Sequence, residues 1–127
     1  MLKTMVGRGV VLLAMLPLVA GSAPQVQIDA VIASPDKFRM LLENEHVRVV
    51  EYTLEPGARD QWHTHPPKVS YVVTGGTLRI TTDDGRSFLT DEKEGSVAWM
   101  DALGRHFAEN VGKTPIRIVL VEVKSSN

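Results

Sequence analysis

The sequence predicts an all-β domain, built as a barrel or sandwich of short antiparallel strands. Three observations indicate this fold class. Runs rich in Val, Ile, Thr and Tyr are bounded by Gly, Pro, Asn and Asp, turn signals recur at roughly the 8- to 12-residue spacing typical of such folds, and no segment after Phe38 keeps a helical period. The chain has 127 residues, of which 43% are hydrophobic and 23% charged, and this composition suits one globular domain.

Each expected strand ends at a turn signal. The first three end at Asn44-Glu45, Glu55-Pro56-Gly57 and Pro66-Pro67, which are rich in residues that interrupt a strand. Gly75-Gly76 and the hairpin turn Asp83-Asp84-Gly85 separate the next ones. The expected strands are 39–43, 46–54, 59–65, 69–74, 77–82, 86–90, 96–100, 105–110 and 116–124.

The last of these strands is apolar on both faces. Ile116, Ile118 and Leu120 point one way, whereas Val119 and Val121 point the other. A strand of this kind needs cover on both faces, from a second sheet or from a partner subunit. We therefore expect a homodimer.

The first 22 residues have the features of a secretory signal peptide. Lys3 and Arg8 precede an apolar run over 10–20, and Ala20-Gly21-Ser22 supplies small residues before a cleavage site after Ser22. The alternative is an uncleaved membrane anchor, but the run is shorter than the roughly 20 residues that a spanning helix needs. We expect an exported protein, periplasmic or secreted, without membrane contact after cleavage. It would comprise a lead-in segment over 23–37 and a barrel domain over 38–127.

Composition excludes several kinds of chemistry. The chain has no Cys, which excludes disulfides, thiolate metal sites and cysteine nucleophiles. Its net charge of −1 gives no basic surface for nucleic acid, so no nucleic-acid partner is expected.

Histidines are the best candidates for a functional site. His63 and His65 lie two residues apart, so on a strand they project from the same face, and Gln61 shares that parity. Imidazole nitrogens are common ligands of zinc- and iron-type ions. His106 lies on a later expected strand and becomes the third ligand if the barrel closes. His46, in a polar stretch, is expected at the surface.

The surroundings of these histidines resemble the two motifs of the cupin superfamily. The segment Gly57-Ala-Arg-Asp-Gln-Trp-His63-Thr-His65 fits G-x5-H-x-H, with Gly76 closing the motif. Gly95 precedes His106-Phe-Ala-Glu-Asn110, which fits H-x3-N. The likeness runs from about Leu41 to Lys124 and is closest to the small single-domain cupins.

This resemblance implies a jelly-roll barrel, also called a double-stranded β-helix, with a divalent transition metal (Fe, Mn, Zn, Ni or Cu) near its centre. His63, His65 and His106 take the three histidine positions, and Asn110 takes a position more plausibly structural than ligating. Gln61 is a candidate fourth ligand, although a hydrogen bond to a ligand is the simpler role. Tyr71 and Trp99 are candidates for lining the pocket.

The sequence also departs from the cupin pattern. The usual glutamate ligand is replaced by Val69 or Ser70, and the distance to Gly76 favours Val69. The usual Pro and Gly of the second motif are Asp101 and Leu103. Neither Val nor Ser replaces a carboxylate ligand, so the resemblance identifies no particular reaction.

Two kinds of function remain open. Three neutral imidazoles leave a doubly charged ion, which suits a small anionic or chelating molecule, with dioxygenase-like or other metal-assisted chemistry. The alternative is a non-catalytic small-molecule-binding or structural module that has lost the glutamate ligand.

Overall fold

The computed structural model describes residues 17–18, 20–21, 23–24 and 26–126. The predicted signal peptide therefore lies largely outside the described residues. Those residues contain eight strands and one short helix, so the prediction of an all-β domain is confirmed. Within the same part of the chain, no helix is both long and apolar enough to cross a membrane.

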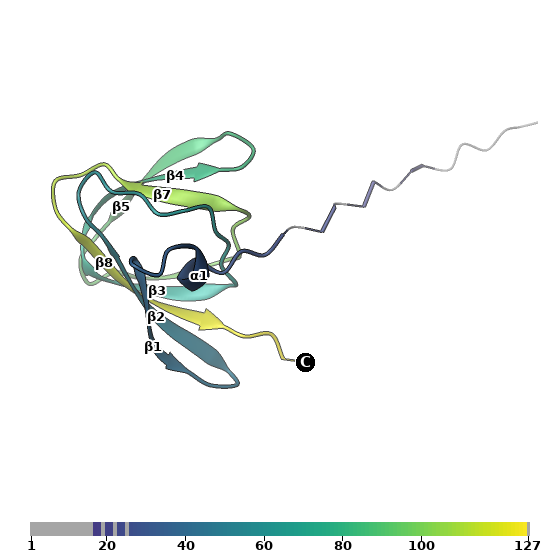
Figure 1. Ribbon diagram of the computed structural model, residues 1–127, viewed down its shortest axis with the longest axis horizontal. Coiled ribbons are helices and arrows are strands. Elements are labelled where there is room, and N and C mark those ends of the chain that lie inside the picture. Colours follow the sequence, from purple (N-terminus) through teal and green to yellow (C-terminus); the bar gives the residue numbers. More distant parts are fainter. Residues whose placement is uncertain (1–16, 19, 22, 25, 127) are drawn as a thin grey trace, which may run out of the picture.

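The strands form two antiparallel sheets that face each other (Figure 1). The larger sheet has the order β1-β2-β8-β3-β6, and the smaller sheet has the order β5-β4-β7. The elements are α1 (Ala30–Ala33), β1 (Phe38–Glu43), β2 (Val47–Leu54), β3 (Lys68–Thr74), β4 (Gly76–Thr82), β5 (Ser87–Glu92), β6 (Val97–Met100), β7 (His106–Asn110) and β8 (Ile116–Val123).

Alternation along β8 determines which side chains enter the barrel. Ile116, Ile118 and Leu120 are buried between the sheets, while Val119 and Val121 are half-buried on the outer face. Glu122 continues the buried series at the end of the strand. The core side chains of the other strands include Phe38, Val50, Tyr52, Leu54, Val72, Leu78 and Ala108.

The strand expected over 59–65 is not regular. Only isolated bridges occur there, at Arg59, His63 and Thr64, although several backbone hydrogen bonds join this segment to β7. The nearby prolines Pro66 and Pro67 lack the N–H that a continuous ladder requires. The segment therefore follows β7 irregularly before β3 begins.

The lead-in segment is more ordered than the sequence indicated. Asp29 caps α1 through a hydrogen bond from the Val31 backbone N–H to its carboxylate. Ile28 and Thr64 are joined by backbone and side-chain hydrogen bonds. The segment before α1 thus lies against the stretch that carries His63 and His65.

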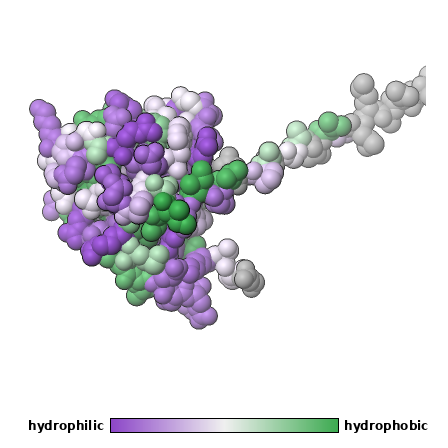
Figure 2. All heavy atoms as spheres, viewed as in Figure 1, coloured by the Kyte–Doolittle hydropathy of each residue, from purple (hydrophilic) through white to green (hydrophobic). Residues whose placement is uncertain are grey.

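Most of the surface seen in Figure 2 is hydrophilic, but hydrophobic atoms gather over α1 and over β1. The exposed apolar side chains there include Ile32, Met40, Leu41 and Leu42. Because β1 is an edge strand of the larger sheet, this apolar surface is continuous with an unpaired strand edge.

Candidate metal centre

Three histidines from distant parts of the chain meet inside the barrel. His63 and His106 face each other as an isolated antiparallel bridge, in which each backbone N–H donates to the other residue's carbonyl, at 2.9 and 3.0 Å. The ring centroid of His106 lies 4.4 Å from that of His63 and 5.6 Å from that of His65. The potential ligand atoms of the three rings all lie within 4.8 Å of one another. The structure therefore brings the three predicted residues together.

Backbone carbonyls fix two of these rings. The Nδ1 atom of His63 lies 2.7 Å from the Gln61 carbonyl oxygen, and that of His106 lies 2.7 Å from the Gly104 carbonyl oxygen. A carbonyl oxygen can only accept, so each Nδ1 carries the proton. Each neutral ring is left with a free lone pair on Nε2, which is the form that binds a metal.

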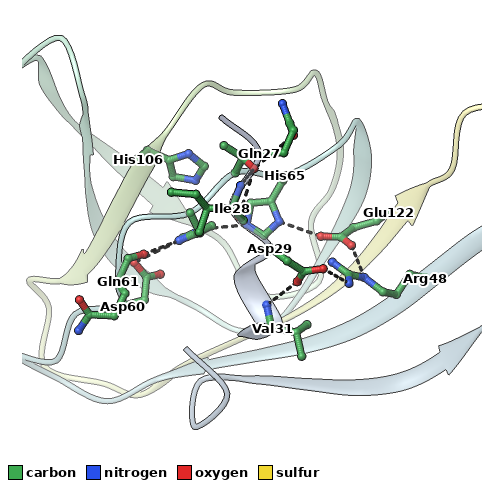
Figure 3. A network of polar contacts seen from close by, with 12 residues as sticks. Gln27, Ile28, Asp29, Val31, Arg48, Asp60, Gln61, His65, His106 and Glu122 are labelled. Carbon is green, nitrogen blue, oxygen red and sulfur yellow. Dashed lines mark hydrogen bonds and ion pairs between the residues drawn. The ribbon is translucent and has the colours of Figure 1, made fainter. Parts of the chain in front are cut away.

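A chain of charged side chains fixes the third ring (Figure 3). His65 Nδ1 donates to Glu122 at 2.8 Å, Arg48 donates to the other carboxylate oxygen of Glu122 at 2.7 Å, and Arg48 also donates to Asp29 at 2.6 Å. Burial alone would raise the pKa of Glu122, but the hydrogen bonds from His65 and Arg48 outweigh it and lower that pKa. The carboxylate is therefore ionised and can only accept, which places the His65 proton on Nδ1 as well.

These assignments leave two lone pairs directed at each other. His63 Nε2 and His65 Nε2 are 3.0 Å apart. With both protons on Nδ1, no hydrogen lies between the two Nε2 atoms, so the contact is repulsive unless a cation is shared. Two nitrogens bound to one zinc-type ion at roughly 2.0–2.1 Å cannot lie more than about 4.2 Å apart, so this contact fits a common ion.

Burial keeps the three rings uncharged. Loss of hydration lowers the pKa of His63, lowers that of His65 to about 3 and lowers that of His106 to about 4. Phe38 contributes to this apolar environment, with its ring centroid 5.3 Å from that of His63. Neutral imidazole predominates at neutral pH, so metal binding requires no deprotonation of these rings.

Asp60 is a buried carboxylate that was not among the predicted site residues, and it also supports the histidine site. Asp60 accepts hydrogen bonds from the Tyr52 hydroxyl at 2.7 Å and from the Ala108 backbone N–H at 2.8 Å. One of its oxygens lies 3.7 Å from His63 Nδ1. Burial raises the pKa of Asp60. Asp60 thereby joins β2, β7 and the segment that carries His63.

The expected substitute for the missing glutamate ligand needs correction. Along β3 the residues that face the interior are Lys68, Ser70 and Val72, whereas Val69 points to the outer face, where it pairs with Trp99 of β6. Ser70 and Lys68 therefore occupy the wall where spacing alone favoured Val69. Both side chains line the cavity beside the histidines.

The cavity itself is small and mostly apolar. It has a volume of about 110 Å³. Besides the histidines, its apolar walls include Phe38, Leu78, Ile80, Ala108, Ile118 and Leu120. A concave apolar pocket with a few convergent polar groups is the usual form of a small-molecule site.

The aromatic residues predicted to line this pocket do not do so. Tyr71 is 46% exposed and Trp99 is 57% exposed, both on the outer face of the larger sheet. Their positions alternate with cavity-facing ones, which explains the error. Tyr52 lines the cavity in their place.

The remaining candidates have structural or surface roles. The Gln61 side chain is exposed, and only its backbone carbonyl reaches His63. Asn110 is 0% exposed, and its side chain hydrogen-bonds to the backbone of Leu54, Thr114 and Gly112. His46 is exposed beside Glu45, as expected. Neither Gln61 nor Asn110 offers a side chain to the three histidines.

Comparison with known proteins agrees with this architecture. Residues 50–122 match the family described as Cupin domain. A cupin domain from Bordetella pertussis Tohama I is similar, with 23% identity, a TM-score of 0.64, and coverage of 82% of this chain and 100% of that one.

Two further solved structures share the fold. A cupin 2 conserved barrel domain protein from Salinispora arenicola has 15% identity and a TM-score of 0.54, with 89% and 90% of the two chains covered. An RmlC-like cupin family protein from Methanocaldococcus jannaschii has 17% identity and a TM-score of 0.55, with 68% and 77% covered. No curated protein matches the chain. The family match spans more than half of the sequence, and its fold is the double-stranded β-helix predicted from the motifs, so this chain belongs to the cupin family.

Proposed function

We propose that this cupin binds a divalent transition metal through His63, His65 and His106 and presents it to a small anionic or chelating molecule. One observation carries the proposal: all three Nδ1 atoms donate to fixed acceptors, so the Nε2 lone pairs remain free inside one buried cavity.

A metal held by these rings would supply Lewis-acid polarisation of a bound oxygen group, or oxygen activation if it is iron. The protein's own residues do the rest. The acceptors on Nδ1 hold each ring in one orientation, Asp60 fastens β7 to the segment before β3, and apolar side chains form most of the cavity wall. The proposal requires no carboxylate ligand from β3.

Elemental analysis tests the metal site. The purified protein is expected to carry close to one equivalent of transition metal, and His63→Ala combined with His106→Ala should abolish it. His46→Ala is the matched control, because His46 is exposed and distant from the cavity. Full metal content in the double variant would overturn the proposal.

A second experiment separates catalysis from binding alone. The absence of the usual glutamate favours a binding module, whereas a cavity lined by three histidines favours an enzyme. Oxygen uptake would be followed with added iron and a panel of diketones, thiols and phenols. Sustained turnover rejects the binding module, and binding of a panel member without oxygen uptake supports it over a dioxygenase.

Export is a further part of the proposal and depends on the signal-like residues 1–22. N-terminal sequencing of the protein recovered from outside the cytoplasm should begin at Ala23. Recovery of the protein only inside the cell, still carrying Met1, would contradict export.

A further inference from the structure

Lys68 is an unusual residue in the interior of this barrel. It is only 4% exposed, it lies in β3 directly after the histidine segment, and it lines the cavity. Among the residues that the structure describes, none gives the Lys68 ammonium a hydrogen bond or an ion pair. No fully shielded side-chain nitrogen or oxygen among the described residues lacks a hydrogen-bond partner, so the ammonium group itself keeps access to the cavity. A largely buried cation in this position is favoured by an anionic ligand.

The acidic residue paired with Lys68 on the neighbouring strand already has other partners. Glu122 lies opposite Lys68 in the pairing of β3 with β8. However, one of its oxygens accepts from His65 and the other accepts from Arg48. No ion pair joins Glu122 to Lys68 in the described part of the chain. The ammonium group is therefore free to bind something that enters the cavity.

The Lys68 charge also acts on the proposed metal ligands. It contributes to lowering the pKa of His63, His65 and His106, although burial is the largest cause for each ring. The same burial lowers the pKa of Lys68 to about 8, which leaves it mostly protonated at neutral pH. The cavity thus has a positive charge beside three neutral nitrogen donors.

The apolar walls limit the molecule that this charge can bind. A benzene-sized ligand of six non-hydrogen atoms fills an apolar cavity of about 150 Å³, so by proportion a cavity of about 110 Å³ accepts roughly four or five. Leu78, Ile80 and Leu120 offer no hydrogen bonds to such a molecule, and the acids Asp60 and Glu92 in the lining already accept from Tyr52 and Thr90. We therefore expect an occupant with one polar end and a short apolar body.

We propose that Lys68 binds the anionic group of a short carboxylate-type molecule, whose apolar body contacts Leu78, Ile80 and Leu120. This inference deepens the proposed function, on which it rests, because it names the chemical class and the protein group that recognises it. Lys68 is then a specificity-determining residue on the wall that β3 contributes beside the histidines.

Propionate is a suitable probe because it has five non-hydrogen atoms, and propanamide is its uncharged counterpart. Binding of both would be measured by NMR titration of the metal-free protein and by the visible absorption of the cobalt-loaded protein. Lys68→Met removes the charge but keeps an unbranched side chain, and Lys68→Gln serves if the first variant does not fold. Lys113→Gln makes the same charge change at an exposed turn and is the control.

Wild type and K113Q should bind propionate at least 10-fold more tightly than K68M does, since hydrogen bonds to charged groups contribute roughly 10- to 100-fold. Propanamide should not distinguish the variants. K68M should bind cobalt at least as tightly as wild type, because a neighbouring positive charge has been removed.

The two proposals fail in different ways. Equal propionate affinity in wild type and K68M, with cobalt bound to both, would overturn the role of Lys68 and leave the metal site intact. Failure of wild type to bind cobalt would overturn the metal site. The metal-free NMR titration would still support or reject Lys68 in that case.

Discussion

The contact between His65 and Glu122 leads to a sharp prediction about metal affinity. Glu122→Gln removes a charge but keeps the shape of the side chain. In the wild-type protein the Glu122 carboxylate accepts from His65 on one oxygen, at 2.8 Å, and from Arg48 on the other, at 2.7 Å. An amide has a single oxygen, so one of these two donors must face the new NH₂ group.

Both orientations of the amide have a measurable cost. If its oxygen faces His65, the Arg48 guanidinium loses a buried acceptor, which lowers the free energy of unfolding by about 2–4 kcal/mol. If its oxygen faces Arg48, the His65 ring moves its proton to Nε2 and ceases to be a ligand. We expect metal affinity to fall roughly 10- to 100-fold, the usual effect of losing such a partner.

The assay combines urea unfolding, followed by tryptophan fluorescence, with competition against a coloured zinc chelator. Glu109→Gln is the control, because Glu109 pairs with Arg79 at 3.2 Å in a partly exposed position worth at most about 1 kcal/mol. If Glu122→Gln matches Glu109→Gln in both stability and zinc affinity, the carboxylate does not orient His65 and the reasoning is refuted.

Three other predictions follow from the same structure. After chelator treatment the protein should lose stability as the pH falls below about 6.5. His65 and His106 have pKa values of about 3 and 4 in the folded protein, so they stay neutral there, whereas in the unfolded chain they bind protons near their ordinary pKa. At pH 5 the free energy of unfolding should be about 4 kcal/mol lower, and urea unfolding curves that coincide at pH 7.5 and 5 would contradict this. Asn110→Ala removes three hydrogen bonds from a fully buried amide, so it should lower the free energy of unfolding by about 2–4 kcal/mol. The metal content should stay unchanged. Loss of metal in a folded variant would show instead that this residue belongs to the site. We also propose that a second copy of the chain covers the apolar outer face of the larger sheet. Light scattering should then show a dimer, and Trp99→Glu should convert it to a monomer. A monomeric wild-type protein would reject this proposal.

Alternation of apolar residues made the barrel predictable. The alternation along β8 separated Ile116, Ile118 and Leu120 from Val119 and Val121, although both sets are apolar and only the structure shows that the first set is buried; Gly75-Gly76 marked the boundary between β3 and β4. The pattern failed over 59–65, where the spacing of His63 and His65 suggested a strand. The spacing of two residues indicates that their side chains lie on one side of an extended segment. It does not show whether that segment forms continuous backbone hydrogen bonds with a neighbouring strand.

The groups that orient the histidines were harder to predict. Two of them are the carbonyls of Gln61 and Gly104, and a backbone group has no signature in the sequence. Glu122 did have a signal, because it shares the parity of the buried residues in β8. Its charge suggested the solvated end of a strand, since an acidic residue is rarely buried unless it is paired. The pairing with Arg48 spans 74 positions and becomes evident only once β2 and β8 are adjacent.

The charges around the cavity argue for an anionic ligand whether or not the protein is an enzyme. Three neutral imidazoles do not compensate the charge of a divalent ion, and Lys68 adds a further positive charge. The buried acids nearby already have partners, since Asp60 accepts from Tyr52 and Glu122 accepts from Arg48. Glu92 also lines the cavity, where it accepts a hydrogen bond from Thr90. Ser70 and Lys68, the residues of β3 beside the histidines, supply no negative charge. If a divalent ion is bound there, we therefore expect the bound molecule to balance part of its charge, which would favour anions.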